Sequence, residues 1–280
     1  MLGLRTLGVA IAAMLVIATA VRAGAADDAA RRLLPDDVRE KGVLVAGLPL
    51  DFEPWNYFDE KNEQVGLDVD VIKAVAAALG LKPEIQRLGF ATIIPAITGG
   101  RVDIGMFGIL EARLKQVSYV RYTLLANGLI VRKGNPTGIT NLDACGRSVA
   151  VEKGTQPVMV WENQAKLCET AGKKKLDLMV FDGKGSQVLA VETGRADGAG
   201  VTLATAVIAA KHSNGKLEPA PGGPVPGASI DGGIAMRKDR KQLALAIEAA
   251  MKVVHASGDY ERIFAKWSLS DSKVGPAIFE

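Results

Sequence analysis

The chain has little of what most enzymes and nucleic-acid-binding proteins use at their sites. Its 280 residues include two histidines and two cysteines, too few close together for the usual metal ligand sets. Nucleophile elbows and Gly-rich phosphate loops are absent. No basic run is longer than Lys173–Lys175, whereas nucleic-acid binding needs a concentrated basic face. We therefore expect neither a cofactor nor nucleic acid as a partner.

Long hydrophobic runs are also missing after residue 26. Before it, Arg5 precedes an uncharged run from Leu7 to Ala20, and small residues follow at Ala23–Ala26. This run is roughly 14 residues long, shorter than the about 20 residues of a membrane span. The pattern predicts a signal peptide over residues 1–25, cleaved after Ala25, and hence a periplasmic protein. An uncleaved membrane anchor is the alternative.

Neither charge sign is in large excess once this segment is removed. Residues 1–25 contain Arg5 and Arg22 and no acidic residue, so 34 basic residues become 32 against 31 acidic ones. The expected mature charge is therefore +1 rather than +3. The remaining residues suffice for one large domain or for two lobes with separate cores.

The two cysteines are Cys145 and Cys168. An exported chain meets an oxidising compartment, so an even pair predicts a disulfide. Two free, buried thiols are the alternative.

The first half of the chain alternates strands and helices. The apolar run Val43–Ala46 is typical of a buried strand, and a helix is expected from Asp68 to Gly80. A strand at 83–86, a helix at 90–98 and a strand at 102–106 follow. Strands that alternate with helices indicate βαβ units and a mostly parallel sheet.

The same order restarts after Asn141. Strands are expected at 148–151, 176–181 and 198–201, helices at 157–171, 186–193 and 202–210, and a Pro- and Gly-rich loop at 216–227. The sequence GGRVD at 99–103 is repeated in part as GRAD at 194–197. Two similar lobes that enclose a cleft suit the capture of a small molecule. We predict one lobe over 27–126 and 230–280, and the other over 127–229.

An ordered set of motifs covers nearly the whole mature chain. They are FEPW at 52–55, VGLDVDVIKA at 65–74, IPAITGGRVD at 94–103, RLKQV at 113–117 and GDYERI at 258–263. Together they resemble the extracytoplasmic polar amino-acid-binding proteins of ABC importers, which have the type II periplasmic binding protein fold. The resemblance implies an α/β protein of two lobes joined by two hinge crossings. It also implies a monomer that captures a small carboxylate-bearing solute, an amino acid or a similar compound, for an ABC permease in the inner membrane.

The resemblance also implies which residues hold the ligand. Arg113 is expected to bind its α-carboxylate, because a planar guanidinium matches both oxygens. Phe52 and Phe90 stand where the family covers the ligand side chain, and Trp55 is nearby, with core packing as the alternative. The remaining expected contacts come from the start of a helix in the second lobe.

That helix follows Gly154 and begins near Thr155 and Gln156. Amides at a helix N-terminus attract a carboxylate. Simple capping of the helix by Thr155 is the alternative, and both roles can coexist.

Two departures from the family bear on the ligand. The loop before the arginine, 106–110, contains Gly108 but lacks the hydroxyl residues of the family. Thr202 stands where the family has an ammonium-binding aspartate. A desolvated ammonium without a carboxylate partner costs several kcal/mol. Either Asp51 or Asp231 supplies the carboxylate, or the ligand lacks a free α-ammonium.

The alternative function is an exported dehydratase of the cyclohexadienyl type, acting on prephenate or arogenate with the same scaffold. General acid–base chemistry needs a placed titratable group. We expect His212 and His255 to lie outside the cleft, which favours a binding protein. A separate soluble sensing module is a third alternative.

Overall fold

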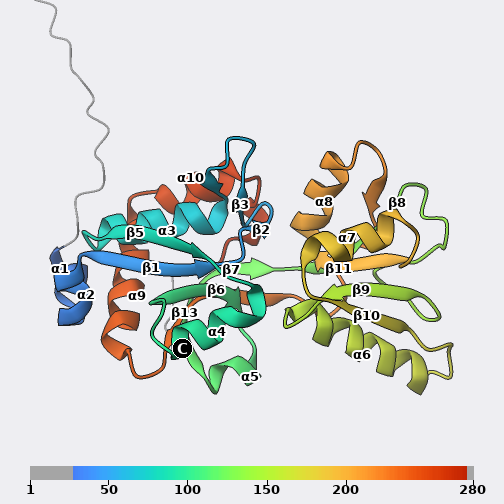
Figure 1. The fold of residues 1–280 in the computed structure, drawn as a ribbon, viewed down its shortest axis with the longest axis horizontal. Coiled ribbons are helices and arrows are strands. Elements are labelled where there is room, and N and C mark those ends of the chain that lie inside the picture. Colours follow the sequence, from blue (N-terminus) through green and yellow to red (C-terminus); the bar gives the residue numbers. More distant parts are fainter. Residues whose placement is uncertain (1–27, 276–280) are drawn as a thin grey trace, which may run out of the picture.

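The computed structural model describes residues 28–275 (Figure 1). The predicted signal peptide at 1–25 lies outside the described residues. Within the described range, no helix is both long enough and apolar enough to cross a membrane. The structure has two five-stranded sheets, which lie side by side in Figure 1, and one small three-stranded sheet.

The first sheet has the strand order β5-β1-β6-β13-β7. Strand β1 pairs in parallel with β5 and β6, whereas β13 runs antiparallel to β6 and β7. Alternate residues of β1 face opposite layers, with Leu44 and Ala46 in one core and Val45 in the other. Burial on both faces explains the continuous apolar run of this strand. The strands are β1 Val43–Leu48, β5 Lys82–Arg87, β6 Ile104–Gly108, β7 Val117–Leu125 and β13 Ile230–Arg237.

Helices cover both faces of this sheet. The larger core lies under α3, α9 and α10, which pack against one another. The smaller core lies under α4 on the opposite face. The helices of this lobe are α1 Asp28–Arg32, α2 Asp36–Lys41, α3 Leu67–Ala78, α4 Phe90–Thr98, α5 Glu111–Leu114, α9 Lys241–Ala256, α10 Asp259–Lys266 and the short 3₁₀ helix η1 Ser270–Ser272.

The second sheet repeats the arrangement of the first. Its order is β10-β9-β11-β8-β12, with β9 parallel to β10 and β11, and β8 antiparallel to β11 and β12. The two-lobed α/β fold is therefore confirmed, and each sheet is mixed. The elements are β8 Asn127–Arg132, β9 Ser148–Glu152, α6 Gln156–Thr170, β10 Asp177–Phe181, α7 Lys184–Glu192, β11 Gly198–Thr202, α8 Leu203–His212 and β12 Leu217–Pro219.

The repeated Gly-Arg-x-Asp sequence has the same structural role in both lobes. Asp103 precedes β6, and its Oδ2 accepts a hydrogen bond from the backbone N of Val45 in β1 at 2.8 Å. Asp197 precedes β11, and its Oδ2 accepts from the backbone N of Ser148 in β9, also at 2.8 Å. Each carboxylate thereby holds the start of one strand beside its parallel neighbour.

Several elements were not expected from the sequence. Strand β7 was missed, as was the small sheet of β2 Asp51–Phe52, β3 Asn56–Phe58 and β4 Gln64–Val65. The expectation of an unbroken loop over 216–227 is wrong, because Leu217–Pro219 pairs with β8. The chain passes between the sheets from β7 to β8 through Ala126, and returns to the first sheet at β13.

The predicted disulfide is confirmed. Cys145 and Cys168 are bonded, with their Cα atoms 5.5 Å apart. The bond joins the segment before β9 to α6 and packs in a hydrophobic core of the second lobe.

Replacing both cysteines with serine should lower the free energy of unfolding by roughly 3 kcal/mol, because the unfolded chain regains the freedom of the closed loop. Urea denaturation followed by circular dichroism measures the difference. Wild type treated with a reductant is the control and should lose a similar amount. A loss near zero in both would contradict this account of the bond.

Candidate functional site

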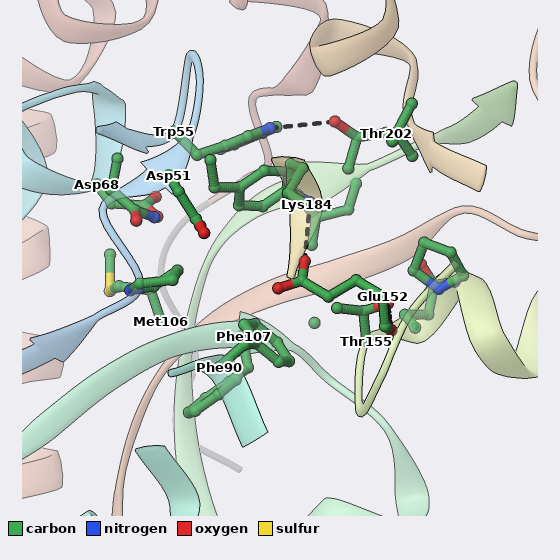
Figure 2. A pocket seen from close by; sticks show the side chains of 18 of the residues that line it. Asp51, Trp55, Asp68, Phe90, Met106, Phe107, Glu152, Thr155, Lys184 and Thr202 are labelled. Carbon is green, nitrogen blue, oxygen red and sulfur yellow. Dashed lines mark hydrogen bonds and ion pairs between the residues drawn. The ribbon is translucent and has the colours of Figure 1, made fainter. Parts of the chain in front are cut away.

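A pocket lies between the two lobes, and residues of both lobes line it (Figure 2). All eight residues that the sequence suggested as ligand contacts take part in this lining. They are Phe52, Trp55, Phe90, Gly108, Arg113, Thr155, Gln156 and Thr202. The fold thus brings together side chains that are up to 150 positions apart in the sequence.

Arg113 bridges the two lobes inside this pocket. It belongs to the short helix α5 and is 7% exposed. Its Nη1 donates to the carbonyl oxygen of Gly108 at 2.9 Å, and its Nη2 donates to that of Gly154 at 2.7 Å. Gly108 ends β6 in the first lobe, and Gly154 follows β9 in the second.

The positive charge of Arg113 has no acidic partner among the described residues. Its guanidinium carbon lies 5.5 Å from the ring centroid of Phe90 and 5.4 Å from that of Phe107. Across residues 28–275, no acidic side chain forms an ion pair with it. Burial lowers the pKa of Arg113, and burial raises the pKa of nearby Tyr119 to about 12. Since Tyr119 stays neutral at physiological pH, the pocket contains a buried cation that an anion can neutralise.

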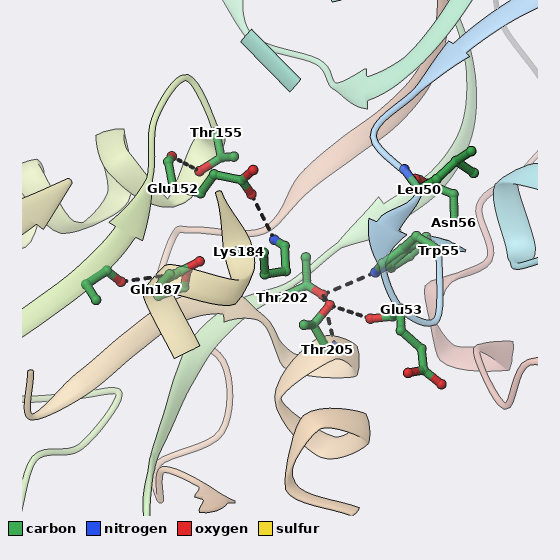
Figure 3. A network of polar contacts seen from close by, with 12 residues as sticks. Leu50, Glu53, Trp55, Asn56, Glu152, Thr155, Lys184, Gln187, Thr202 and Thr205 are labelled. Carbon is green, nitrogen blue, oxygen red and sulfur yellow. Dashed lines mark hydrogen bonds and ion pairs between the residues drawn. The ribbon is translucent and has the colours of Figure 1, made fainter. Parts of the chain in front are cut away.

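Trp55 and Thr202 form a second polar bridge between the lobes (Figure 3). Trp55 is 2% exposed and packs in the core of the first lobe, so it is both a core residue and a pocket residue. Its Nε1 donates to Thr202 Oγ1 at 3.2 Å, and Thr205 Oγ1 donates to the carbonyl oxygen of Glu53 at 2.9 Å. The lobes are therefore held together in this structure at both sides of the pocket.

The side chains of Thr155 and Gln156 are already engaged within the second lobe. Thr155 is the N-cap residue of α6, but its hydroxyl donates to the carbonyl oxygen of Glu152 at 2.6 Å and makes no capping bond. The alternative of capping by this side chain is therefore wrong. Gln156 accepts a hydrogen bond from Asn127 and donates to the carbonyl oxygen of Ala228 at 2.9 Å.

Of the two acids suggested as substitutes for the missing aspartate, only Asp51 lines the pocket. Asp231 instead pairs with Arg121 at 3.1 Å and is not part of the lining. Asp51 is exposed at the rim of the pocket. Partial desolvation by the surrounding protein raises its pKa, against the opposing effects of Lys184 and Arg87.

Sequence reasoning missed an ion pair in the pocket, formed by Glu152 and Lys184 (Figure 2). Two signals could have indicated it. Glu152 directly follows the apolar run Val149–Val151, at the carboxyl end of a parallel strand, where α/β sheets place ligands. Lys184 begins α7, where a basic side chain opposes the helix dipole and so needs another reason to be there.

Asp68 was also missed as a pocket residue. It is buried in the first lobe, where Oδ1 accepts from Tyr122 Oη at 2.5 Å and Oδ2 accepts from Asn56 Nδ2 at 2.7 Å. Burial raises the pKa of Asp68 to about 7, although both hydrogen bonds act in the opposite direction. The carboxyl group therefore belongs to a closed hydrogen-bond network at the wall of the pocket.

The model of the bacterial extracellular solute-binding proteins, family 3, matches residues 44–270. The chain belongs to this family. This confirms the predicted fold and the predicted class of a solute-binding protein.

Individual relatives agree with this assignment. The arginine-binding extracellular protein ArtP of Bacillus subtilis is 30% identical, over 81% of this chain and 86% of its own. The arginine-binding protein ArgBP from T. maritima, in a crystal structure of a mutant, is 29% identical in sequence to this chain. The two structures match with a TM-score of 0.72, over 83% of this chain and 97% of that one. An ancestral amino-acid-binding protein, described as a precursor of cyclohexadienyl dehydratase, shares the fold at 24% identity and a TM-score of 0.69, covering 83% of this chain and 97% of its own.

The raised pKa of Asp68 predicts a pH dependence of stability. Since its value of about 7 in the folded protein exceeds the ordinary 3.8, the folded protein binds more protons between these pH values. The contribution of Asp68 to the free energy of unfolding therefore falls as pH rises from about 4 to 7, by at most about 1.4 kcal/mol per pH unit.

Asp68→Asn cannot titrate and should reduce this slope. Urea denaturation at pH 5, 6 and 7 compares the variant with wild type. Parallel stability curves for the two proteins would show that Asp68 titrates normally in the folded state.

Proposed function

We propose that the protein captures a small carboxylate-bearing solute, an amino acid or a similar compound, and delivers it to an ABC permease. The observation that carries this proposal is the buried Arg113, which contacts both lobes and has no acidic partner within residues 28–275. A carboxylate is the anion that a guanidinium binds with two parallel hydrogen bonds. The names of ArtP and ArgBP as arginine-binding proteins support an amino-acid-like solute.

Capture proceeds by closure of two lobes over the solute. One lobe comprises residues 27–126 and 230–280, and the other comprises residues 127–229. The hinge lies at the two crossings, near 124–128 and 229–233. A guanidinium has five N–H donors, and carbonyl oxygens accept from two of the nitrogens of Arg113. The remaining donors and the amides at the N-terminus of α6 bind the carboxylate.

The other predicted contacts surround the rest of the solute. Phe52, Phe90 and Trp55 supply apolar walls that exclude water and strengthen the polar contacts inside. Gly108, Thr155, Gln156 and Thr202 also belong to the lining.

The place of action is the periplasm, which the chain reaches through a signal peptide over residues 1–25, and the protein acts there as a monomer. The family to which it belongs is extracellular. This localisation agrees with the Cys145–Cys168 disulfide, since such bonds persist in oxidising compartments.

We further propose that the protein is not a dehydratase. His212 ends α8, and its Nδ1 lies 3.1 Å from Glu53 Oε2. His255 stacks on Tyr260 with 3.8 Å between the ring centroids. Neither histidine lines the pocket, and two of the titratable groups that do, Glu152 and Lys184, form an ion pair with each other. Purified protein incubated with prephenate should therefore produce no phenylpyruvate by ultraviolet absorbance. Sustained turnover, absent from a heat-denatured sample, would reverse this assignment.

Arg113→Ala should weaken solute binding by more than about tenfold, since a charge-assisted hydrogen bond contributes about 1.5–3 kcal/mol. Calorimetric titration with the twenty amino acids identifies which of them bind the wild type, and the same compounds are then titrated into the variant. Arg101→Ala is the matched control, because Arg101 is exposed and outside the pocket. Equal affinities in wild type and Arg113→Ala would contradict the proposed function.

A further inference from the structure

The ion pair between Glu152 and Lys184 is not explained by the carboxylate site at Arg113. The two charged atoms, Glu152 Oε2 and Lys184 Nζ, lie 3.1 Å apart, and the side chains are 6% and 13% exposed (Figure 3). Both residues line the pocket. Burying an ion pair removes the hydration of both charges, and this cost can exceed their mutual attraction. The burial of this pair is therefore weak evidence that its role is to stabilise the fold. Its position in the pocket suggests a role in binding.

The ammonium of Lys184 occupies a place that suits an organic cation. Its Nζ lies 4.2 Å from the ring centroid of Phe52, which belongs to the other lobe. An aromatic face attracts a cation, and a desolvated cation is attracted more strongly. The charge of Lys184 also acts on Asp51 at the rim. The surroundings of this one ammonium thus combine an aromatic face, a buried carboxylate and a second acid nearby.

An unused acceptor lies in the same pocket. Asn127 is fully buried at the start of β8, and its Nδ2 donates to Gln156 and to the carbonyl oxygen of Ala228. Among the described residues, nothing donates to its Oδ1. An unpaired buried acceptor is unfavourable unless a ligand or water satisfies it. A solute with N–H groups can donate to this oxygen.

We propose that Glu152 is the acceptor for a cationic group of the solute, an ammonium or a guanidinium, and that Lys184 fills this place while the pocket is empty. The inference rests on the proposed function, because the carboxylate of the same solute binds Arg113. It gives the pocket the carboxylate that is missing at Thr202. Glu152 precedes Gly154, whose carbonyl oxygen contacts Arg113, by two residues, so the anion and cation sites are adjacent.

Competition between the solute and Lys184 follows from this arrangement. The side chain of Lys184 is long and flexible and can move toward solvent when the cation of the solute takes its place. Removing this lysine should leave Glu152 free for the solute, whereas removing the charge of Glu152 should eliminate the cation site. The two residues of one ion pair therefore have opposite expected effects on affinity.

Four carboxylates separate the two sources of cationic charge. L-Arginine has an α-ammonium and a guanidinium, L-leucine has only the α-ammonium, 5-guanidinopentanoate has only the guanidinium, and 4-methylpentanoate has neither. Each is titrated calorimetrically into wild type, Glu152→Gln, Lys184→Met and the double variant. Glu169→Gln and Lys175→Met are matched controls, because this exposed pair on the same lobe is outside the pocket.

Glu152→Gln should weaken, by about tenfold or more, the binding of each compound that carries the cationic group bound by Glu152, since this is the value of a charge-assisted hydrogen bond. It should leave 4-methylpentanoate unaffected. Weakening for L-arginine and L-leucine assigns the α-ammonium to Glu152, and weakening for L-arginine and 5-guanidinopentanoate assigns the guanidinium. Lys184→Met should bind the cationic compounds as tightly as wild type or more tightly. The double variant, which has no unpaired charge at this place, should resemble Glu152→Gln.

Equal loss of affinity in Lys184→Met and Glu152→Gln would overturn the inference, because the pair would then act as one structural unit. Equal wild-type affinity for 4-methylpentanoate and L-arginine would also overturn it, while the proposed function would stand. Failure of the wild type to bind any of the four carboxylates would count against the proposed function itself. Circular dichroism establishes that each variant is folded.

Discussion

The buried guanidinium of Arg113 is the constraint on which the site depends. A charge taken out of water costs several kcal/mol unless an opposite charge or hydrogen bonds replace its hydration. Here two carbonyl oxygens and two aromatic rings surround the cation, and no acidic side chain of residues 28–275 pairs with it. An anionic solute would complete this environment. Gly108, whose carbonyl oxygen accepts from this guanidinium, has little room for a side chain, since a Cβ atom there would lie 2.2 Å from Ile230 Cδ1.

Three contacts between the lobes in the pocket involve polar or charged groups. Arg113 contacts the carbonyl oxygen of Gly154, Trp55 donates to Thr202, and the ammonium of Lys184 lies over the ring of Phe52. Each involves a side chain that lines the pocket. Closure of the lobes and occupation of the pocket are therefore linked, because the same groups serve both. Polar contacts of this kind can be exchanged for contacts with a solute when the lobes move.

The sequence predicted the features that repeat or that follow from local pattern. The alternation of strands and helices, the repeated sequence that contains Asp103 and Asp197, and the Cys145–Cys168 bond could all be predicted from periodicity, repetition and compartment. Strand β7 was missed, because its mixture of hydroxyl, aromatic and basic residues gives no clear alternation. The hydroxyl of Thr155 bonds to a preceding carbonyl oxygen rather than to its helix, and local sequence does not distinguish these two bonds.

The charged residues on the second lobe's side of the pocket could not be predicted from the sequence, because only the tertiary structure brings them together. The family resemblance located Arg113 and the aromatic walls. Glu152 and Lys184, which pair with each other, come from elements more than 30 residues apart in the chain. The side chain of Lys184 also meets Phe52 of the other lobe, a contact that no pattern in one segment could indicate. The departure at Thr202 pointed to a missing carboxylate without showing where another one lies.

A crystal structure of the protein with its copurified solute, identified by mass spectrometry, tests the central claim most directly. The account predicts an organic acid in the pocket between the lobes, with its carboxylate within hydrogen-bond distance of the Arg113 guanidinium. A solute bound elsewhere, or Arg113 turned toward bulk solvent while the pocket is occupied, would contradict it.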